Sequence, residues 1–235
     1  MKKLALALLG LTIVGSSAFA QTTGVLSRNA VGYVKVTIPK GKLALIRNDF
    51  EDISGAGLAI TNVIGDQVPV GSTILLWDYT FNPAPKYVPI NKAAANRGGW
   101  GAGGTNRLVR GQSFFLQIPS GAASNEYQVY LMGEVPDKTT APTSTVGVIT
   151  SLGMYGVPYP VSEYWTNTTL AKNAAVGDSL LLWNGDAYVP YNKAAANRGG
   201  WGAATNVILA PGQGFWFQTS NASSNWSVPK PYTWP

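Results

Sequence analysis

The chain lacks cysteine and histidine altogether, and only 12% of its residues are charged. Without cysteine we expect neither a disulfide framework nor a lipid anchor on a cysteine. Without either residue, Ser-His-Asp and Cys-His catalysis and the common zinc sites are excluded. These absences remove most hydrolases and leave the burial of apolar surface as the source of stability.

Acidic residues are also scarce, and the candidates in the first half of the chain are Asp49, Glu51, Asp52 and Asp78. A glycosidase needs only two carboxylates at a suitable separation, so this group is the one candidate for an acid pair. Loops with several acids are more often solvated than catalytic. The sequence also has no phosphate-binding loop placed between a strand and a helix, and no EF-hand calcium loop. We therefore predict no enzyme, no catalytic residue, no cofactor and no metal site.

The longest apolar run lies near the start of the chain, where it is too short to cross a membrane. Lys2 and Lys3 precede the apolar run Leu4–Val14, and Ala18-Phe19-Ala20 then forms an A-x-A cleavage site. This pattern predicts a signal peptide over residues 1–20 and no transmembrane segment. We expect a secreted protein, extracellular or on the cell surface, with the periplasm as the alternative compartment.

A nearly exact internal repeat is the strongest positive signal in the sequence. The segment Tyr87–Ala102 matches Tyr188–Ala203 at fifteen of sixteen positions. The match extends more loosely on both sides, where GSTILLWD aligns with GDSLLLWN and RGQSFFLQ aligns with PGQGFWFQ. We infer β module 1 over 24–134, a linker rich in Pro and Thr over 135–145, and β module 2 over 146–235.

The residue pattern within a module is typical of strands rather than helices. Val34, Val36 and Ile38 alternate with polar neighbours, which indicates a half-buried strand. The run Ile74–Trp77 is continuously apolar, which suits a strand covered on both faces. Together with 27 Gly, 15 Pro and little charge, this predicts an all-β fold of two tandem homologous modules. Each module is expected to be a β-sandwich or a partly closed barrel, and the two copies to pack about a pseudo-twofold axis.

Short helical turns are expected in two places. The repeated segment predicts one helical turn with Asn91 or Asn192 as its N-cap and Gly98 or Gly199 just past its end. Leu58–Ile64 predicts another short helix. The pair Asn184-Gly185 predicts a type I′ hairpin turn.

The repeated segment also supplies the residue types of a binding site. An aromatic face can stack on a sugar ring while Arg, Lys and Asn side chains hydrogen-bond hydroxyls or carboxylates. The competing interpretation makes the tryptophans core residues, and we favour it for them because buried tryptophan is common in small β cores. For the arginines the two interpretations are evenly balanced. The candidate ligand-binding residues are Tyr87, Asn91, Lys92, Asn96, Arg97, Trp100, Tyr188, Asn192, Lys193, Asn197, Arg198 and Trp201.

The order of these features resembles uncharacterised secreted tandem β-module proteins of environmental Gram-negative bacteria. The shared features are a Val-Gly-Tyr opening strand, an aliphatic strand ending in Trp, a Gly-Trp pair, PGQGFW and a closing strand ending near Gly133-Glu134. Module 2 is expected to depart from the pattern at its end, where Pro229, Pro231 and Pro235 replace an ordinary closing strand. The resemblance implies export and architecture, not chemistry.

We therefore predict a non-enzymatic structural or adhesive protein of the cell surface or extracellular matrix. The alternative is a carbohydrate-binding protein that uses the twin Asn-Arg-Gly-Gly-Trp segments, and a hydrolase working with carboxylates alone ranks third. The expected partners are polysaccharide or envelope components, or further copies of the chain. Nucleic acid is not expected, because the formal charge of +6 is not gathered in a basic cluster.

Overall fold

A computed structural model describes residues 30–52, 56–136, 143–148, 151–221 and 224–232. The predicted signal peptide and its cleavage site lie outside the described residues. Within these ranges, no helix is both long enough and apolar enough to cross a bilayer.

Module 1 is built almost entirely from antiparallel strands. Its main sheet has the strand order β2-β7-β4-β5, β1 pairs with β8 in a separate ribbon, and β3 pairs with β6. The elements are β1 (Val31–Pro39), β2 (Leu43–Arg47), β3 (Leu58–Ala59), α2 (Ile60–Val63), β4 (Thr73–Asp78), β5 (Lys86–Asn91), η1 (Ala95–Arg97), η2 (Gly101–Thr105), β6 (Arg107–Leu108), β7 (Ser113–Gln117) and β8 (Glu126–Glu134).

Module 2 repeats these elements in the same order and adds one short helix, η3. Its sheets have the orders β10-β15-β12-β13, β9-β16 and β11-β14, and none of the sheets closes into a barrel. The first strand, β9, begins inside the range predicted to be the linker. The elements are β9 (Thr143–Val148), β10 (Ser151–Tyr155), β11 (Glu163–Tyr164), η3 (Trp165–Asn167), α3 (Thr169–Asn173), β12 (Ser179–Trp183), β13 (Tyr188–Asn192), η4 (Ala196–Arg198), η5 (Gly202–Asn206), β14 (Ile208–Leu209), β15 (Phe215–Thr219) and β16 (Ser224–Pro229). The predicted all-β fold is confirmed, with open, sandwich-like sheets.

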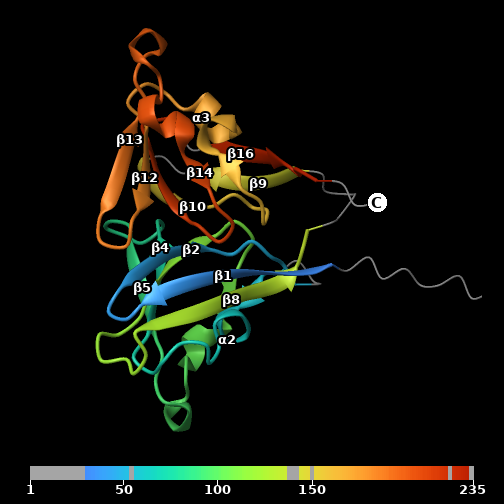
Figure 1. The fold of residues 1–235 in the computed structure, drawn as a ribbon, viewed down its shortest axis with the longest axis vertical. Coiled ribbons are helices and arrows are strands. Elements are labelled where there is room, and N and C mark those ends of the chain that lie inside the picture. Colours follow the sequence, from blue (N-terminus) through green and yellow to red (C-terminus); the bar gives the residue numbers. More distant parts are fainter. Residues whose placement is uncertain (1–29, 53–55, 137–142, 149–150, 222–223, 233–235) are drawn as a thin grey trace, which may run out of the picture.

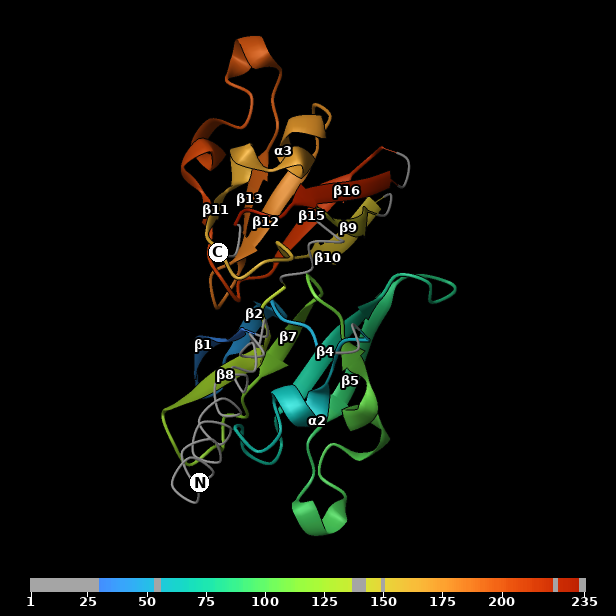
Figure 2. The same ribbon diagram turned by 90° about the vertical axis from the view of Figure 1, so that its right-hand side faces the viewer.

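The two modules are stacked along the long axis of the molecule, with their four-stranded sheets meeting in the middle (Figures 1 and 2). In β4, Ile74 and Leu76 point into the core of module 1, whereas Leu75 and Trp77 join a cluster shared by both modules. The continuous apolar pattern of this strand is therefore confirmed as burial on both faces. The alternating pattern of β1 is confirmed too, because Ile38 is fully buried on its inner face.

Two local predictions are wrong. Asn91 and Asn192 end strands β5 and β13 and do not cap helices. The short helices η1 and η4 begin later, after Ala94 and Ala195. The hairpin between β12 and β13 has four loop residues, 184–187. The Asn184 side chain stabilises this loop by accepting hydrogen bonds from the amides of Asp186 and Ala187. A type I′ turn requires positive φ at both of its central residues. Among these four residues φ is positive only at Gly185, so the turn is of another type.

The C-terminal segment folds back on its own chain. Strand β16 pairs with β9, and Trp226 within it is buried in the core of module 2. Beyond β16, the Tyr232 hydroxyl donates to Pro136 O at 2.9 Å and its ring packs edge-on against Tyr159. This segment therefore covers the junction between the modules.

Candidate functional site

The tryptophans of the repeated segment belong to the two cores. Trp100 and Trp201 are only 5% and 8% exposed. Each indole Nε1 donates to a main-chain carbonyl at the end of the short helix of its own module, Gly65 O at 2.9 Å and Ala171 O at 3.0 Å. Neither ring is available as a stacking platform for a sugar.

The lysines of the segment bind the same helix ends. Lys92 Nζ donates to Gly65 O at 3.0 Å and Val68 O at 2.8 Å, and Lys193 Nζ donates to Ala174 O at 2.6 Å. A cation is favourable at a helix C-terminus, where the last carbonyls lack partners within the helix. The repeated lysine and tryptophan therefore clamp α2 and α3 to the sheets.

This role predicts a stability effect at Lys92. The variant Lys92→Met is expected to lower the free energy of unfolding by about 1.5–3 kcal/mol, because one buried and one partly buried carbonyl lose a charged donor. Chemical denaturation measures the loss. Lys35→Met, on the exposed face of β1, is the control and should leave stability unchanged. A stable Lys92→Met protein would contradict the clamp.

The predicted tyrosines lie at the junction between the modules. The hydroxyls of Tyr87 and Tyr188 are 3.2 Å apart, which joins the edge strands β5 and β13. Burial, with a smaller effect from the neighbouring Tyr188 hydroxyl, raises the pKa of Tyr87. These side chains hold the modules together and lie apart from the turns at η1 and η4.

The asparagines that end β5 and β13 are used within their sheets. Asn91 Oδ1 accepts from Thr73 Oγ1 at 2.8 Å, and Asn192 Oδ1 accepts from Ser179 Oγ at 2.6 Å. In both cases the partner lies directly opposite on the neighbouring strand. These contacts are cross-strand pairs that stabilise a sheet.

The rest of the candidate set forms what we call the polar tips: Asn96 with Arg97, and Asn197 with Arg198. All of these side chains are exposed. They stand on η1 and η4, which project from opposite ends of the long axis (Figure 1). The structure therefore separates the two pairs and does not bring them into one site.

The backbone of each tip is held by matching hydrogen bonds. In module 1, Ala93 N donates to Gly99 O at 2.7 Å, and in module 2 Ala194 N donates to Gly200 O at 2.7 Å. Gly98 and Gly199, which end the short helices as predicted, have φ of 92° and 94°. Such values favour glycine and explain its repetition here.

The acidic residues considered for hydrolysis do not form an acid pair. Asp52 Oδ2 lies 2.9 Å from Arg107 Nη1, and Glu51 Oε2 lies 3.8 Å from Arg110 Nη1. Asp78 accepts hydrogen bonds from the hydroxyl and amide of Thr80, which lower its pKa. None of these side-chain contacts joins two carboxylates, although Glu51 is the backbone bridge partner of Glu134.

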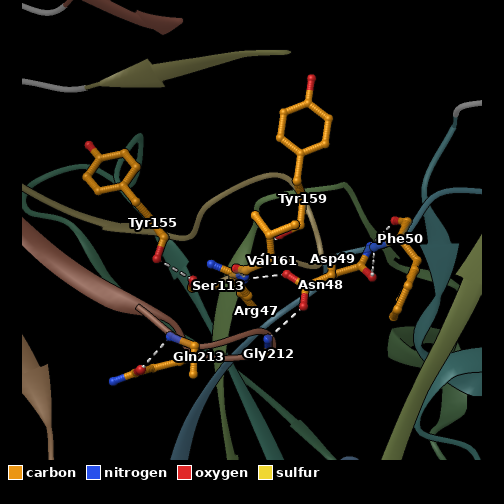
Figure 3. Close-up of polar contacts among 11 residues, drawn as sticks. Arg47, Asn48, Asp49, Phe50, Ser113, Tyr155, Tyr159, Val161, Gly212 and Gln213 are labelled. Carbon is orange, nitrogen blue, oxygen red and sulfur yellow. Dashed lines mark hydrogen bonds and ion pairs between the residues drawn. The ribbon is translucent and has the colours of Figure 1, made fainter. Parts of the chain in front are cut away.

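Asp49 forms a buried ion pair with Arg47, which sequence reasoning missed (Figure 3). Both side chains are fully buried at the junction between the modules. Asp49 Oδ2 accepts from Gly212 N at 2.6 Å. Arg47 Nη2 donates to Tyr159 O at 3.1 Å and Val161 O at 3.3 Å. The pair from module 1 therefore hydrogen-bonds module 2.

Burial dominates the electrostatics of this pair. It raises the pKa of Asp49 to about 6, although the Arg47 charge and the Gly212 amide oppose the change. Desolvation also lowers the pKa of Arg47. The sequence contains one signal for this pair. Arg47 directly follows the apolar residues Leu43–Ile46 of the same strand, and a charged residue that is buried in such a strand needs a partner of opposite charge.

Glycines in module 2 make room for this part of module 1. A Cβ added to Gly156 would lie 2.5 Å from Arg47 Cδ, and one added to Gly214 would lie 2.6 Å from Ser113 Oγ. The repeat and the strand registers make Gly156 the counterpart of Arg47 and Gly214 the counterpart of Ser113. At both places a residue of module 1 packs against its own equivalent.

Aromatic contacts across the junction are reciprocal. The Trp77 ring packs edge-on against Trp216 with centroids 4.9 Å apart, and Trp183 packs edge-on against Phe115 at 5.5 Å. Trp183 is the repeat counterpart of Trp77, and Phe115 is that of Trp216. The modules therefore meet about a pseudo-twofold axis.

Comparison with models of known protein families, with curated proteins and with solved structures finds no match. The candidate functional features therefore rest on geometry alone: two polar tips at the ends and one tightly packed junction between the modules.

Proposed function

We propose that the chain is a secreted, non-enzymatic structural or adhesive protein that bridges material of the cell surface or extracellular matrix. The observation that carries this proposal is the placement of two nearly identical exposed turns at opposite ends of the molecule (Figure 1). Two weak contacts held in fixed positions gain avidity on a polymer or a surface.

The junction supports the proposal because it makes the spacing between the tips rigid. Phe115 and Trp216 are buried there, and the Arg47–Asp49 pair hydrogen-bonds across it. A linker that let the modules turn freely would not hold the tips apart. A packed junction instead keeps the two modules in one relative orientation, so the distance between the two tips is constant.

The alternative, carbohydrate binding by the repeated segments, loses its aromatic part because Trp100 and Trp201 are buried. What remains at each tip is an asparagine and an arginine, which suit hydroxyl, carboxylate or phosphate groups. A bridging role needs no more than such contacts. We therefore rank the structural or adhesive function first.

The test is a bridging assay with residues 21–235 on envelope fractions and insoluble polysaccharides. The parent chain should bind them and cross-link labelled particles. The single variants Arg97→Ala and Arg198→Ala should bind but no longer cross-link, and the double variant should lose binding. The exposed Lys35→Ala is the charge-matched control and should behave as the parent. Binding that survives in a folded double variant would refute the proposal.

A further inference from the structure

The junction has two seams related by the pseudo-twofold arrangement, and they are not alike. At one seam, residues 212–214 continue the pairing of β2, and Arg47 N donates to Gly212 O at 2.9 Å. At the other, where all residues concerned are described, no backbone hydrogen bond joins 111–113 to 154–156. One seam is therefore closed by backbone hydrogen bonds. At the other, which we call the open seam, the segments are joined instead by a side-chain hydrogen bond from Ser113 Oγ to Tyr155 O at 2.5 Å.

The open seam contains a cleft of about 340 Å³, which we call the junction cleft. One wall is the end of β4 with the segment 109–113, and the other is formed by β9 and β10. Its volume falls at the lower end of the roughly 300–1,000 Å³ typical of small-molecule sites. The cleft also lies between two structural units, where such sites commonly occur.

The longer loop of module 1 supplies aromatic surface to this cleft. Trp77 lines it from β4, and Tyr79, which is 54% exposed, lines it from the loop that follows. In module 2 the equivalent loop is the short turn 184–187. There Trp183 Nε1 donates to Leu43 O at 2.7 Å, whereas the buried Trp77 Nε1 has no hydrogen-bond partner among the described residues.

Polar groups in the cleft also differ from those at the closed seam. Arg110, Gln112 and Ser113 line the cleft from module 1. Arg110 has Pro211 as its repeat counterpart, and it is the one charged residue among the described residues that line the cleft. Its guanidinium is positioned over the Tyr159 ring, 5.2 Å from the ring centroid. The cleft therefore combines aromatic faces with a positioned cation.

We infer that the junction cleft binds an acidic saccharide no larger than a disaccharide. A pyranose ring has an apolar C–H face that packs on an aromatic ring, and a rim of hydroxyls that needs hydrogen-bond partners. Trp77 and Tyr79 offer the aromatic faces, and Gln112 offers an amide. Arg110 selects a carboxylate, which matches its planar fork of donors and replaces the long 3.8 Å contact between Arg110 Nη1 and Glu51 Oε2.

This inference is independent of the polar tips. It concerns one site at the middle of the molecule, whereas bridging requires two sites at its ends. The double variant Arg97→Ala/Arg198→Ala should therefore keep saccharide binding, and a variant of the cleft should keep bridging. Failure of one property leaves the other standing.

The test is a titration of residues 21–235 with methyl glucuronide and with methyl glucoside, followed by calorimetry and saturation-transfer NMR. The glucuronide should bind about tenfold more tightly, as expected for one charge-assisted contact of about 1.4 kcal/mol. Arg110→Gln should remove this preference. Tyr79→Ala, in an exposed loop, should weaken binding of both ligands about five- to tenfold.

Tyr164→Ala is the matched control, because Tyr164 is an exposed tyrosine of module 2 outside the cleft. It should bind the glucuronide as the parent does. No binding of either sugar to the parent would overturn the inference, as would equal binding by parent and Tyr79→Ala. A preference for glucuronide that survives Arg110→Gln would overturn the role given to the arginine.

Discussion

The variant Arg47→Met is expected to unfold with a free energy about 3–5 kcal/mol lower than the parent at pH 7. The substitution leaves the Asp49 carboxylate fully buried without its cation. It also removes the hydrogen bonds to Tyr159 O and Val161 O in module 2. Chemical denaturation followed by circular dichroism measures the loss.

The loss of unfolding free energy in Arg47→Met should depend on pH in a defined direction. Burial raises the pKa of Asp49 to about 6 in the folded protein, against roughly 3.9 for an unfolded aspartate. A carboxyl with a raised folded pKa favours the folded state most below the unfolded pKa, and this contribution is lost as pH rises through 6. Removing Arg47 raises the folded pKa further. The variant should therefore be closest to the parent near pH 5 and furthest from it near pH 8.

A second substitution separates charge from packing. Arg47→Met/Asp49→Asn contains no buried charge and should recover most of the loss at pH 7, since an apolar replacement of a buried pair is often neutral. Arg97→Met, on an exposed tip, should have no effect. An equal loss at pH 5 and pH 8, with no recovery in the double variant, would mean that packing and not charge governs the site.

The variant Trp216→Ala is expected to cost about 3–5 kcal/mol of unfolding free energy and to weaken the coupling between the modules. Trp216 is buried at the junction, where it contacts Trp77 and Tyr87 of module 1. Hydrogen exchange should therefore become faster in β4 of module 1, although the substitution lies in module 2.

The matched control is Trp165→Ala, which removes an equally buried indole from the core of module 2. It should destabilise module 2 without a direct effect on β4, because Trp165 packs against Trp201, Phe215 and Phe217. If the two variants change exchange in β4 equally, the junction is not what couples the modules.

Much of the fold could be predicted from local patterns. The alternation around Val34 and Val36 and the apolar run Ile74–Trp77 each follow from which faces of a strand are covered. The Arg47–Asp49 pair could not be predicted in this way. Its partners Tyr159, Val161 and Gly212 lie more than a hundred residues along the chain, and no periodic pattern links residues across a junction between modules.

The candidate site was harder to predict, because the same residue types serve two purposes. A lysine and a tryptophan repeated with fixed spacing suit a sugar site, and Lys92 and Trp100 equally suit the capping of α2. Sequence identity between the copies does not distinguish these roles. Exposure does, and it leaves only Asn96, Arg97 and their counterparts at the surface of the tips.

The facing of Arg47 with Gly156, and of Ser113 with Gly214, bears on how the protein came to be one chain. In a homodimer of separate modules, each residue at the axis would meet a copy of itself. Two copies of Arg47 would then bring like charges and overlapping side chains together at one point. Fusion into a single gene removes this restriction, because the two sides can mutate independently. Module 1 alone should therefore be unable to rebuild the junction by pairing with itself.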